Sequence, residues 1–467
     1  MNIFRMNEKS KTREIVSSIY FIGIGGIGMS ALARYFHSKG ARVSGYDKTP
    51  SSLTKELEQT GMQIHYEENV DLIPKDAELV VYTPAVPKEH KELVYYQQKG
   101  YKVVKRSDIL QIVTESSFNI CIAGTHGKTT ITTMVGHLLR HTGYGCNAFL
   151  GGISVNYETN FWSSERNVSV VEADEYDRSF LKLSPDIAII TAMDPDHLDI
   201  YGTAEEMEKA FIDFSGKIKD GGLLISKFGL KRAKELKGTR HLTYSVQNKD
   251  ADAHAENVKM MKGSYEFDVV INEERIENVR LNIGGMHNVE NAIAAITVAS
   301  SLNIDKEKVK SAVADFKGVK RRFEYIIKTD ELVFIDDYAH HPEELRALIN
   351  GAKSLFSEKK CTVIFQPHLY SRTRDLADGF AEVLDMADEV FLLPIYPARE
   401  LPIAGVSSEM IAGKMKNKNV TVCTKEELLL IIDDIKGYSS GKDLEVLITA
   451  GAGDIDLLVE PIKEILK

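Results

Sequence analysis

The sequence predicts an α/β protein built from three domains with mostly parallel sheets. Short apolar runs alternate with segments of helical periodicity along the chain, which is the pattern of strand–helix–strand units. Residues 251–282 break this alternation with runs such as SYEFDVVI and ERIENVRLNI, which indicate a small antiparallel part. Two glycine-rich turns, at residues 23–28 and 124–130, each join an apolar strand to a helix. Such turns predict phosphate-binding sites at strand ends.

The chain length sets the domain count. Because 467 residues are too many for one ordinary hydrophobic core, we divide the chain into residues 1–116, 117–318 and 319–467. The first block alternates through IYFIGIGG, ARVSGYD and ELVVYTP, and the third through ELVFIDD, KCTVIFQ, EVFLLP and LEVLITAG. Both blocks are expected to be Rossmann-like.

The composition limits the cellular compartment and the classes of binding partner that we expect. A formal charge of -10 argues against a basic face for nucleic acid. The four cysteines form no CxxC pair, which favours buried free thiols in a reducing compartment. No run approaches the roughly 20 apolar residues of a membrane helix, and the N-terminus has no apolar stretch that could serve in a signal peptide. We expect a cytoplasmic monomer or homodimer that binds small molecules and neither nucleic acid nor membrane.

The first glycine-rich turn, Gly23–Gly28, fits G-x-G-x-x-G, and Asp47 lies near the end of the next strand. The glycines allow backbone N–H groups and a helix N-terminus to approach a diphosphate. Two alternatives stay open for this block alone. The turn could serve only helix–strand packing, or it could bind a dinucleotide, as in a dehydrogenase.

The second turn, Gly124-Thr125-His126-Gly127-Lys128-Thr129-Thr130, is a more specific signal. It resembles a P-loop, although Ile122 stands where the first glycine of G-x-x-x-x-G-K-[ST] would be. Lys128 can neutralise the β/γ-phosphate charge, and the Thr129 hydroxyl can reach Mg²⁺. The turn predicts a central domain of the P-loop ATPase type.

Acidic side chains follow the next two strands, in NVSVVEADEYD and DIAIITAMDPDHLD. Carboxyl ends of parallel strands share one sheet edge, so these residues are expected beside the P-loop. We predict Glu172 and His197 as metal ligands, although histidine is an uncommon Mg²⁺ ligand. Helix capping and solvation are the alternative for several of the acids, which are Glu172, Asp174, Glu175, Asp177, Asp194, Asp196 and Asp199.

Charged residues also follow strands in the third block. Arginines so placed can bind a carboxylate or phosphate bidentately, whereas a helix N-terminus with solvated charges is the alternative. The residues are Asp336, Asp337, His340, His341, His368, Arg372 and Arg374. The basic stretch Lys317–Arg322 lies at the proposed hinge. It could contact nucleotide phosphates or be a solvated linker.

Together these motifs resemble the Mur ligases, the ATP-dependent ligases of peptidoglycan precursor synthesis. GIGGIGM, AGTHGKTT, EADEYD, DPDHLD, MHNVENAIAA, GVKRRFE, DDYAHHP and FQPHLYSRT occur in the order of that family. They are most similar to the branch that joins L-alanine to the lactyl carboxylate of UDP-N-acetylmuramate. The resemblance implies that an acyl phosphate forms from ATP, that ADP and phosphate are released, and that Mg²⁺ is required.

The resemblance also implies a role for individual residues. The UDP-sugar site would comprise Gly25, Gly26, Ile27, Gly28, Asp47 and Thr83. The ATP site would comprise Gly124, Thr125, His126, Gly127, Lys128, Thr129, Thr130, His287, Asn291, Arg322, Asp337 and His340. The metal ligands would be Thr129, Glu172 and His197, and the amino acid would be held by His368 and Arg372. The catalytic residues would be Lys128, Glu172, His197 and Arg372.

Two positions bear on the branch of the family. Leu369 stands where an arginine follows the histidine in the family pattern, so Arg372 would carry the carboxylate of the amino acid alone. The stretch Phe211-Ile212-Asp213 lacks the lysine that sibling ligases modify to a carbamate, which favours the alanine-adding branch.

Three other functions remain in view. A ligase that recycles a whole tripeptide onto the same nucleotide sugar would share most motifs, but a different sequence is expected around its amino-acid site. Folylpolyglutamate synthases share the central domain but lack a Rossmann-like UDP domain at the N-terminus. An NAD-dependent oxidoreductase would explain only the first 115 or so residues, because a simple dehydrogenase does not need a P-loop.

Overall fold

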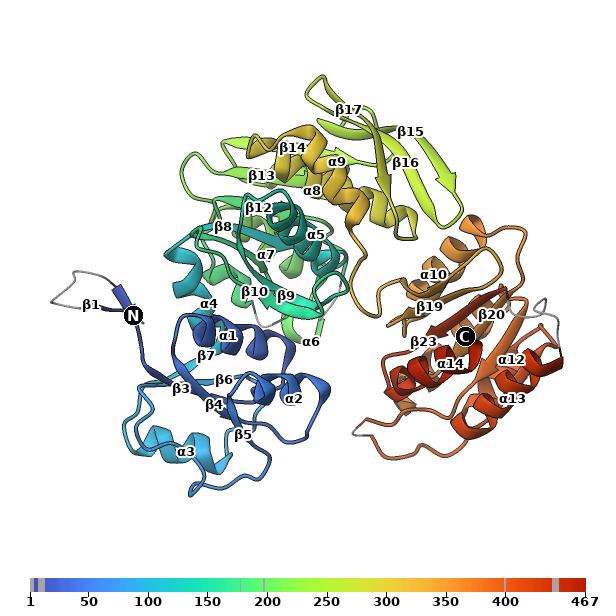
Figure 1. The fold of residues 1–467 in the computed structure, drawn as a ribbon, viewed down its shortest axis with the longest axis horizontal. Helices are drawn as coiled ribbons and strands as arrows, with labels where there is room; N and C mark the ends of the chain where they lie inside the picture. The colour runs from blue at the N-terminus through green and yellow to red at the C-terminus, as the bar shows by residue number, and fades with distance from the viewer. Residues whose placement is uncertain (1–3, 7–12, 177, 196–197, 399, 439–444) are drawn as a thin grey trace. The chain divides into compact units, whose positions relative to one another are not determined.

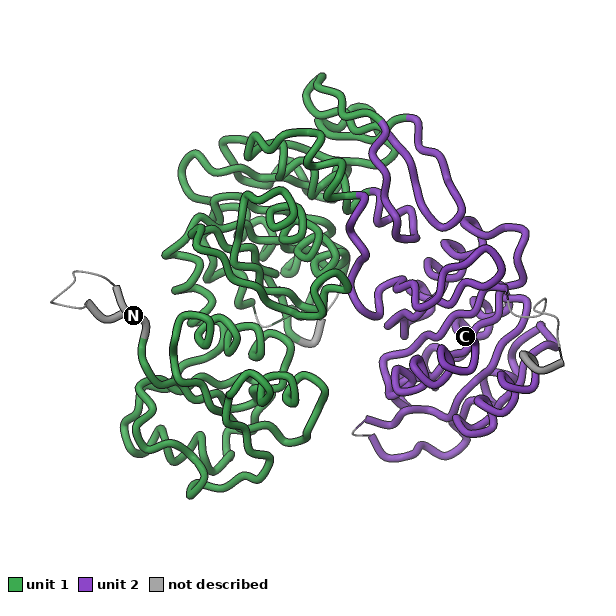
Figure 2. Tube along the Cα trace, in the orientation of Figure 1, with its two compact units in different colours: residues 1–256, 268–277, 290–313 green, residues 257–267, 278–289, 314–467 purple. Residues whose placement is uncertain are grey.

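The computed structural model describes residues 4–6, 13–176, 178–195, 198–398, 400–438 and 445–467. The chain forms two compact units, which Figure 2 distinguishes by colour. Unit 1 contains residues 1–256, 268–277 and 290–313, and unit 2 contains residues 257–267, 278–289 and 314–467. Helices and mostly parallel sheets alternate in both units, which confirms the predicted α/β class.

The N-terminal sheet of unit 1 is parallel, with strand order β5-β4-β3-β6-β7. The chain extends the sheet from β3 through β4 to β5 and then returns to β6 on the other side of β3. Ligands bind at such switch points, and the first glycine turn follows β3 there (Figure 1). The elements are β3 (Ser18–Ile22), α1 (Ile27–Ser38), β4 (Arg42–Tyr46), α2 (Ser52–Gln59), β5 (Gln63–His65), β6 (Leu79–Tyr82), α3 (Lys91–Gln98), β7 (Val103–Lys105) and α4 (Arg106–Glu115), preceded by the antiparallel pair β1 (Phe4–Met6) and β2 (Arg13–Ile15).

The central sheet has the order β10-β9-β11-β8-β12-β13-β14-β15-β16-β17. It is parallel from β9 to β15, and β10 pairs antiparallel with β9. Two-residue turns join β15 to β16 and β16 to β17, which requires antiparallel neighbours and agrees with the predicted ribbon. The strands are β8 (Phe118–Ala123), β9 (Asn147–Ser154), β10 (Thr159–Trp162), β11 (Val168–Glu172), β12 (Ile187–Ile190), β13 (Leu223–Lys227), β14 (Arg240–Ser245), β15 (Ala253–Met261), β16 (Ser264–Ile271) and β17 (Glu274–Leu281). The helices are α5 (Lys128–His141), α6 (Leu198–Tyr201), α7 (Ala204–Ser215), α8 (Met286–Ser301) and α9 (Lys306–Asp315), with short 3-10 turns at Ser179–Lys182 and Ala233–Glu235.

The C-terminal sheet lies in unit 2 and has the order β18-β19-β23-β20-β21-β22. Only β18 runs antiparallel to its neighbour among these strands. The strands are β18 (Glu324–Lys328), β19 (Val333–Asp337), β20 (Cys361–Phe365), β21 (Glu389–Leu392), β22 (Val420–Val422) and β23 (Val446–Ala450). The helices are α10 (Pro342–Leu355), α11 (Tyr370–Leu384), α12 (Ser408–Lys414), α13 (Lys425–Tyr438) and α14 (Val459–Leu466), and a 3-10 turn covers Asp454–Leu458.

Helix α1 packs on the central sheet as well as on its own. Its residue Tyr35 contacts Phe149 of β9 and Phe161 of β10, with ring centroids 5.4 and 6.0 Å apart. The buried amide of Asn160 donates to the Ile27 carbonyl at 2.7 Å and to Ser30 Oγ at 2.8 Å. These contacts join the N-terminal and central sheets within unit 1, so both glycine turns belong to one compact body.

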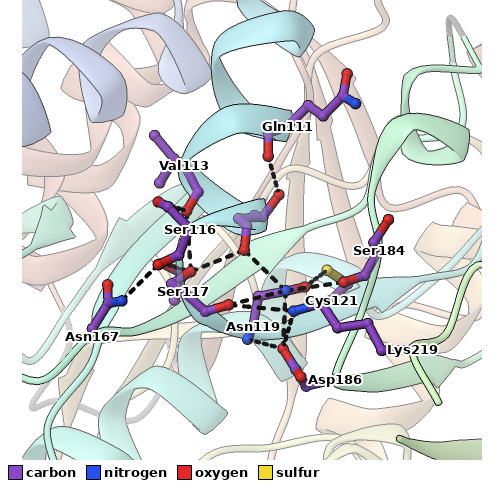
Figure 3. A network of polar contacts seen from close by, with 12 residues as sticks. Gln111, Val113, Ser116, Ser117, Asn119, Cys121, Asn167, Ser184, Asp186 and Lys219 are labelled. Carbon is purple, nitrogen blue, oxygen red and sulfur yellow. Dashed lines mark hydrogen bonds and ion pairs between the residues drawn. The ribbon is translucent and has the colours of Figure 1, made fainter. Parts of the chain in front are cut away.

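A partly buried polar network stabilises the connection between these two sheets, as Figure 3 shows. Asn119, at the start of β8, donates to the carbonyls of Thr114 and Ser184, each at 3.1 Å, and to Asp186 at 3.2 Å. Lys219 donates to the same Asp186 carboxylate at 2.7 Å. The segment between α4 and β8 is therefore held by side-chain hydrogen bonds and is not a free linker.

The four cysteines are buried free thiols, as predicted. Within the described ranges, no helix is both long enough and apolar enough to cross a membrane.

Replacing Asn119 with alanine is expected to lower the free energy of unfolding of unit 1 by about 2–4 kcal/mol, because buried carbonyls lose their donor. The matched control is Asn167→Ala, which removes one hydrogen bond, at 2.7 Å, from an exposed amide to the Ser116 carbonyl. The control should cost about 0.5–1 kcal/mol. Urea unfolding followed by circular dichroism measures both, and equal losses would contradict a special role for the Asn119 network.

Candidate nucleotide and amino-acid sites

Backbone geometry makes glycine necessary at two positions of the P-loop, between β8 and α5. Gly124 has φ +133°, and a Cβ atom there would lie 2.0 Å from Thr191 Oγ1 and 2.8 Å from the Ala192 nitrogen. Gly127 has φ +81° immediately before α5, and its Cβ atom would lie 3.0 Å from Asn291 Oδ1. Both φ values lie in the region that residues with a Cβ atom rarely adopt.

The P-loop is tied to the segment after β12. The Thr125 amide donates to the Ala192 carbonyl at 3.2 Å, and the Asp194 amide donates to Thr125 Oγ1 at 3.3 Å. Thr191 Oγ1 also donates to the His126 carbonyl. These bonds anchor the loop at the N-terminus of α5, where the first helical N–H groups have no partner within the helix and can bind phosphate.

Lys128, the first residue of α5, is held by two acceptors. Its Nζ donates at 2.7 Å to the Gly124 carbonyl and at 2.7 Å to Glu175 Oε1. Burial raises the pKa of the Glu175 carboxyl, and the adjacent Lys128 ammonium opposes that rise. The sequence predicted Lys128 as a phosphate ligand but not its ion pair with Glu175.

Thr129 and Glu172, two of the predicted metal ligands, lie side by side. Thr129 Oγ1 donates to the Glu172 carboxylate, with distances of 3.1 and 3.0 Å to its two oxygens. Gly151 faces that carboxylate, because a Cβ atom on Gly151 would lie 2.0 Å from Glu172 Oε2. A hydroxyl and a carboxylate suit Mg²⁺, which keeps several water and phosphate ligands.

The third predicted metal ligand, His197, lies outside the described residues. Within the described ranges, no group of three or more His, Cys, Asp or Glu side chains could hold a metal ion. The pair of Thr129 and Glu172 is therefore the part of the predicted metal site that the structure brings together.

The remaining predicted ATP ligands divide between the two units. Thr130 lies in the first turn of α5 and the buried Asn291 of α8 lies beside Gly127, both within unit 1. His287, Arg322, Asp337 and His340 belong to unit 2. His126 is exposed, with its imidazole Nε2 3.8 Å from Asp194 Oδ2.

The first glycine turn is organised by Asp47. The Gly25 amide donates to Asp47 Oδ2 at 2.7 Å, and a Cβ atom on Gly23 would lie 2.8 Å from the Thr83 methyl group. Gly26 ends the turn, and Ile27 and Gly28 begin α1. The Asp47 carboxylate, at the position expected of a ribose-binding acid, thus bonds to the turn itself.

The structure adds Arg106 to this turn. A Cβ atom on Gly28 would lie 2.6 Å from the Arg106 guanidinium, which also lies 3.6 Å from Asp174. A cation beside the N-terminus of α1 favours a diphosphate there. Arg106 directly follows β7, so the strand-end rule applied to the acids could have identified it.

In unit 2, Asp337 ends β19 and is enclosed by backbone donors. The Phe323 amide donates to its Oδ2 at 2.6 Å and the Ala339 amide to its Oδ1 at 2.7 Å. Burial raises the pKa of Asp337 to about 6, although these hydrogen bonds and the Arg322 guanidinium favour its charged form. In the basic stretch it is Arg321 that reaches the buried Asp336, at 3.4 Å, and both Arg321 and Arg322 lie over the Tyr338 ring.

The predicted amino-acid ligands His368 and Arg372 lie together after β20. Arg372 Nη1 is 3.4 Å from His368 Nδ1, and His340 lies next to His368 with ring centroids 6.2 Å apart. Burial lowers the pKa of both histidines, and the Arg372 charge lowers both further, which favours neutral imidazoles at neutral pH. Arg372 is then the cation of this cluster.

Tyr396 belongs to the same cluster, which the sequence did not indicate. Its ring stacks on His368 with centroids 5.7 Å apart, and its carbonyl accepts from the Leu369 amide at 2.9 Å. Leu369 has φ +69° immediately before α11. No motif marks Tyr396, because the loop after β21 returns to β20 only in the fold.

The fold and the sites define a nucleotide-binding α/β protein with a P-loop in its central sheet. Three family descriptions match successive parts of the chain: "Mur ligase family, catalytic domain" at residues 18–117, "Mur ligase middle domain" at residues 122–299, and "Mur ligase, glutamate ligase domain" at residues 321–453. The chain belongs to the Mur ligase family.

Curated relatives match nearly the whole chain. A UDP-N-acetylmuramate–L-alanine ligase of Parabacteroides distasonis is 50% identical over 458 residues, which cover 97% of each chain. The enzyme of the same name from Flavobacterium johnsoniae is 46% identical and covers 97% of this chain and 98% of its own.

Solved structures share the fold. The UDP-N-acetylmuramate–alanine ligase of Thermotoga maritima is 31% identical, with a TM-score of 0.79, over 96% of this chain and 98% of its own. A murein peptide ligase of Psychrobacter arcticus has a TM-score of 0.67 over 97% of this chain and 99% of its own, but at 22% identity it shows the fold alone.

Gly124→Ala is expected to weaken ATP binding ten- to hundredfold, because the new methyl group displaces the loop and the backbone strain is of order 1–3 kcal/mol. Gly143→Ala is the matched control, since Gly143 also has positive φ, +78°, but has nothing within 4 Å of its Cβ position. Calorimetric titration with ATP and Mg²⁺ measures both. An unchanged Kd in the Gly124 variant would show that this close approach does not shape the site.

Proposed function

We propose that this chain joins L-alanine to the lactyl carboxylate of UDP-N-acetylmuramate, using ATP and releasing ADP and phosphate. The observation that supports this most is the near-complete coverage by relatives of that name, at 50% identity in the first of them. The two glycine turns in one unit and the His368–Arg372 cluster supply sites of suitable chemistry for the three substrates. The enzyme would act in the cytoplasm on peptidoglycan precursors.

The division of labour follows the three sheets. Residues 1–116 would bind the UDP sugar through Gly25–Gly28, with Asp47 and Thr83 shaping the turn and Arg106 near the diphosphate. Residues 117–318 would bind ATP, and residues 319–467 would bind the amino acid through His368 and Arg372. His287, Arg322, Asp337 and His340 would complete the nucleotide site.

The chemistry proceeds in two steps. A carboxylate oxygen of UDP-N-acetylmuramate attacks the γ-phosphorus of ATP, and the bond to ADP breaks. Lys128 stabilises the negative charge on the transferred phosphoryl group by position and charge. The amine of L-alanine then attacks the acyl carbon, loses a proton, and expels inorganic phosphate.

Mg²⁺ would be held by Thr129 and Glu172, with His197 serving a second metal position. When bound, Mg²⁺ neutralises charge on the phosphate oxygens. Exclusion of water from the acyl phosphate is a further requirement, because hydrolysis would waste ATP.

The two alternative functions differ from the proposal in the amine substrate or in the residues that they would use. A tripeptide-recycling ligase uses the same nucleotide sugar, so only the amine substrate separates it from the proposal. An NAD-dependent oxidoreductase would leave Lys128, Thr129 and Glu172 without a role.

Phosphate release by the purified protein tests the proposal. With ATP and Mg²⁺, release is expected only when both UDP-N-acetylmuramate and L-alanine are present. Lys128→Ala should reduce the rate at least about a thousandfold, since it removes the cation at the transferred phosphoryl group. Release with the recycling tripeptide but not with L-alanine would assign the chain to the recycling branch. No phosphate release in any mixture, together with binding of NADH, would favour the oxidoreductase.

Arg372→Ala is expected to raise the KM for L-alanine about ten- to hundredfold, because a charge-assisted hydrogen bond to the carboxylate is lost. The KM for ATP should stay within about twofold, since Arg372 serves the amino acid. Arg374→Ala is the matched control, because Arg374 lies two residues further along α11, is exposed and pairs with Asp375 at 2.7 Å. Equal effects of the two substitutions would contradict the assignment.

A further inference from the structure

The ion pair between Lys128 and Glu175 is the most enclosed one at the P-loop. The Glu175 side chain is 1% exposed and the Lys128 side chain 14% exposed, at an Nζ–Oε1 distance of 2.7 Å. Removing a carboxylate from water is costly, and its attraction to a single lysine seldom does more than compensate for that cost. Stability alone does not explain why an acid occupies this position.

The Glu175 backbone is fixed by its surroundings. Tyr201 Oη donates to the Glu175 carbonyl at 2.7 Å, and the Arg178 amide donates to the same oxygen at 2.9 Å. The second carboxylate oxygen, Oε2, is enclosed and has no hydrogen-bond partner among the described residues. Glu175 is therefore a rigid acceptor that presents one oxygen to Lys128.

Two of the three N–H bonds of Lys128 are engaged by this arrangement. One is directed to the Gly124 carbonyl at the start of the P-loop and one to Glu175, each at 2.7 Å. Because the ammonium group is tetrahedral, two fixed acceptors also define the direction of the third N–H. A lysine that is otherwise flexible thus has one orientation in which a phosphoryl oxygen can accept from it.

The negative charge of Glu175 disfavours the binding of ATP phosphates to Lys128. A carboxylate 2.7 Å from the phosphate-binding ammonium competes for that ammonium and repels the phosphates of ATP. Glu175 should therefore lower ATP affinity while it improves the placement of Lys128 for phosphoryl transfer. A residue that only supports the fold would not produce this pair of opposite effects.

We propose that Glu175 is a positioning residue, which orients Lys128 toward the transferred phosphoryl group at the expense of ATP affinity. This inference rests on the proposed ligase function. It adds a residue whose role is exerted through its contact with Lys128.

Glu175→Gln tests the inference, because it keeps the shape of the side chain and removes its charge. We expect kcat to fall about tenfold or more, since a neutral amide oxygen holds the Lys128 ammonium more weakly than a carboxylate does, and the KM for ATP to fall about threefold or more, since the negative charge that competes with the phosphates is gone. The calorimetric Kd for ATP with Mg²⁺, without the other substrates, should fall in parallel. A kcat within twofold of the wild type, or a KM for ATP that is unchanged or raised, would overturn the proposal.

Asp186→Asn is the matched control. Asp186 also pairs with a lysine at 2.7 Å, in the same unit, but it lies at the opposite edge of the central sheet. It should change stability and leave kcat and the KM for ATP within about twofold. The same split of kcat and KM in this variant would show that the effect is structural.

Glu175→Asp provides a second measurement if the glutamine variant does not fold. The shorter side chain keeps the charge but cannot reach Lys128, so kcat should fall about tenfold while the KM for ATP stays within about twofold. An unchanged kcat would overturn the proposal. The wild-type enzyme distinguishes failure of the ligase function from failure of the positioning role. If the wild type releases no phosphate with L-alanine, the ligase function is refuted. If the wild type turns over normally and the Glu175 variants are unaffected, only the positioning role is refuted.

Discussion

The close approach of the P-loop to the end of β12 is the constraint on which the nucleotide site depends. No side chain fits at Gly124, where a Cβ atom would meet Thr191 Oγ1 at 2.0 Å. This contact directs the loop so that α5 starts at Lys128, with Thr129 within hydrogen-bond distance of Glu172 at the end of β11. The parallel neighbours β11, β8 and β12 bring these residues to one edge, since all three strands end there.

The packing of α1 fixes the N-terminal sheet against the central sheet. Asn160 bonds to the first turn of α1, and Tyr35 fills the space against β9 and β10. A helix that covers one sheet and also packs on the next makes one body of two sheets, and the Asn119 network holds the chain between them. The glycine turn before α1 therefore has a defined place relative to the P-loop, as a reaction between two phosphorylated substrates requires.

Much of this could be predicted because strand ends are visible in the sequence. Gly124, Lys128 and Glu172 follow apolar runs, and parallel sheets bring such ends to one edge. Arg106 obeys the same rule, since it directly follows β7 (Val103–Lys105), but it was not among the predicted site residues. Tyr396 and the pairing of Glu175 with Lys128 follow no such rule, because each depends on which loop folds back onto which side chain.

By itself the sequence determined the α/β class, the strand-to-helix turns and the residue types at their ends, because periodicity and glycine placement are local properties. The resemblance of the ordered motifs extended these to a family, which the relatives confirm. Only the tertiary structure decided that Asp47 bonds to its own glycine turn, that Arg321 and not Arg322 reaches Asp336, and that Glu175 holds Lys128. Partner choice among buried charges depends on distances between distant segments, and no local pattern specifies those distances.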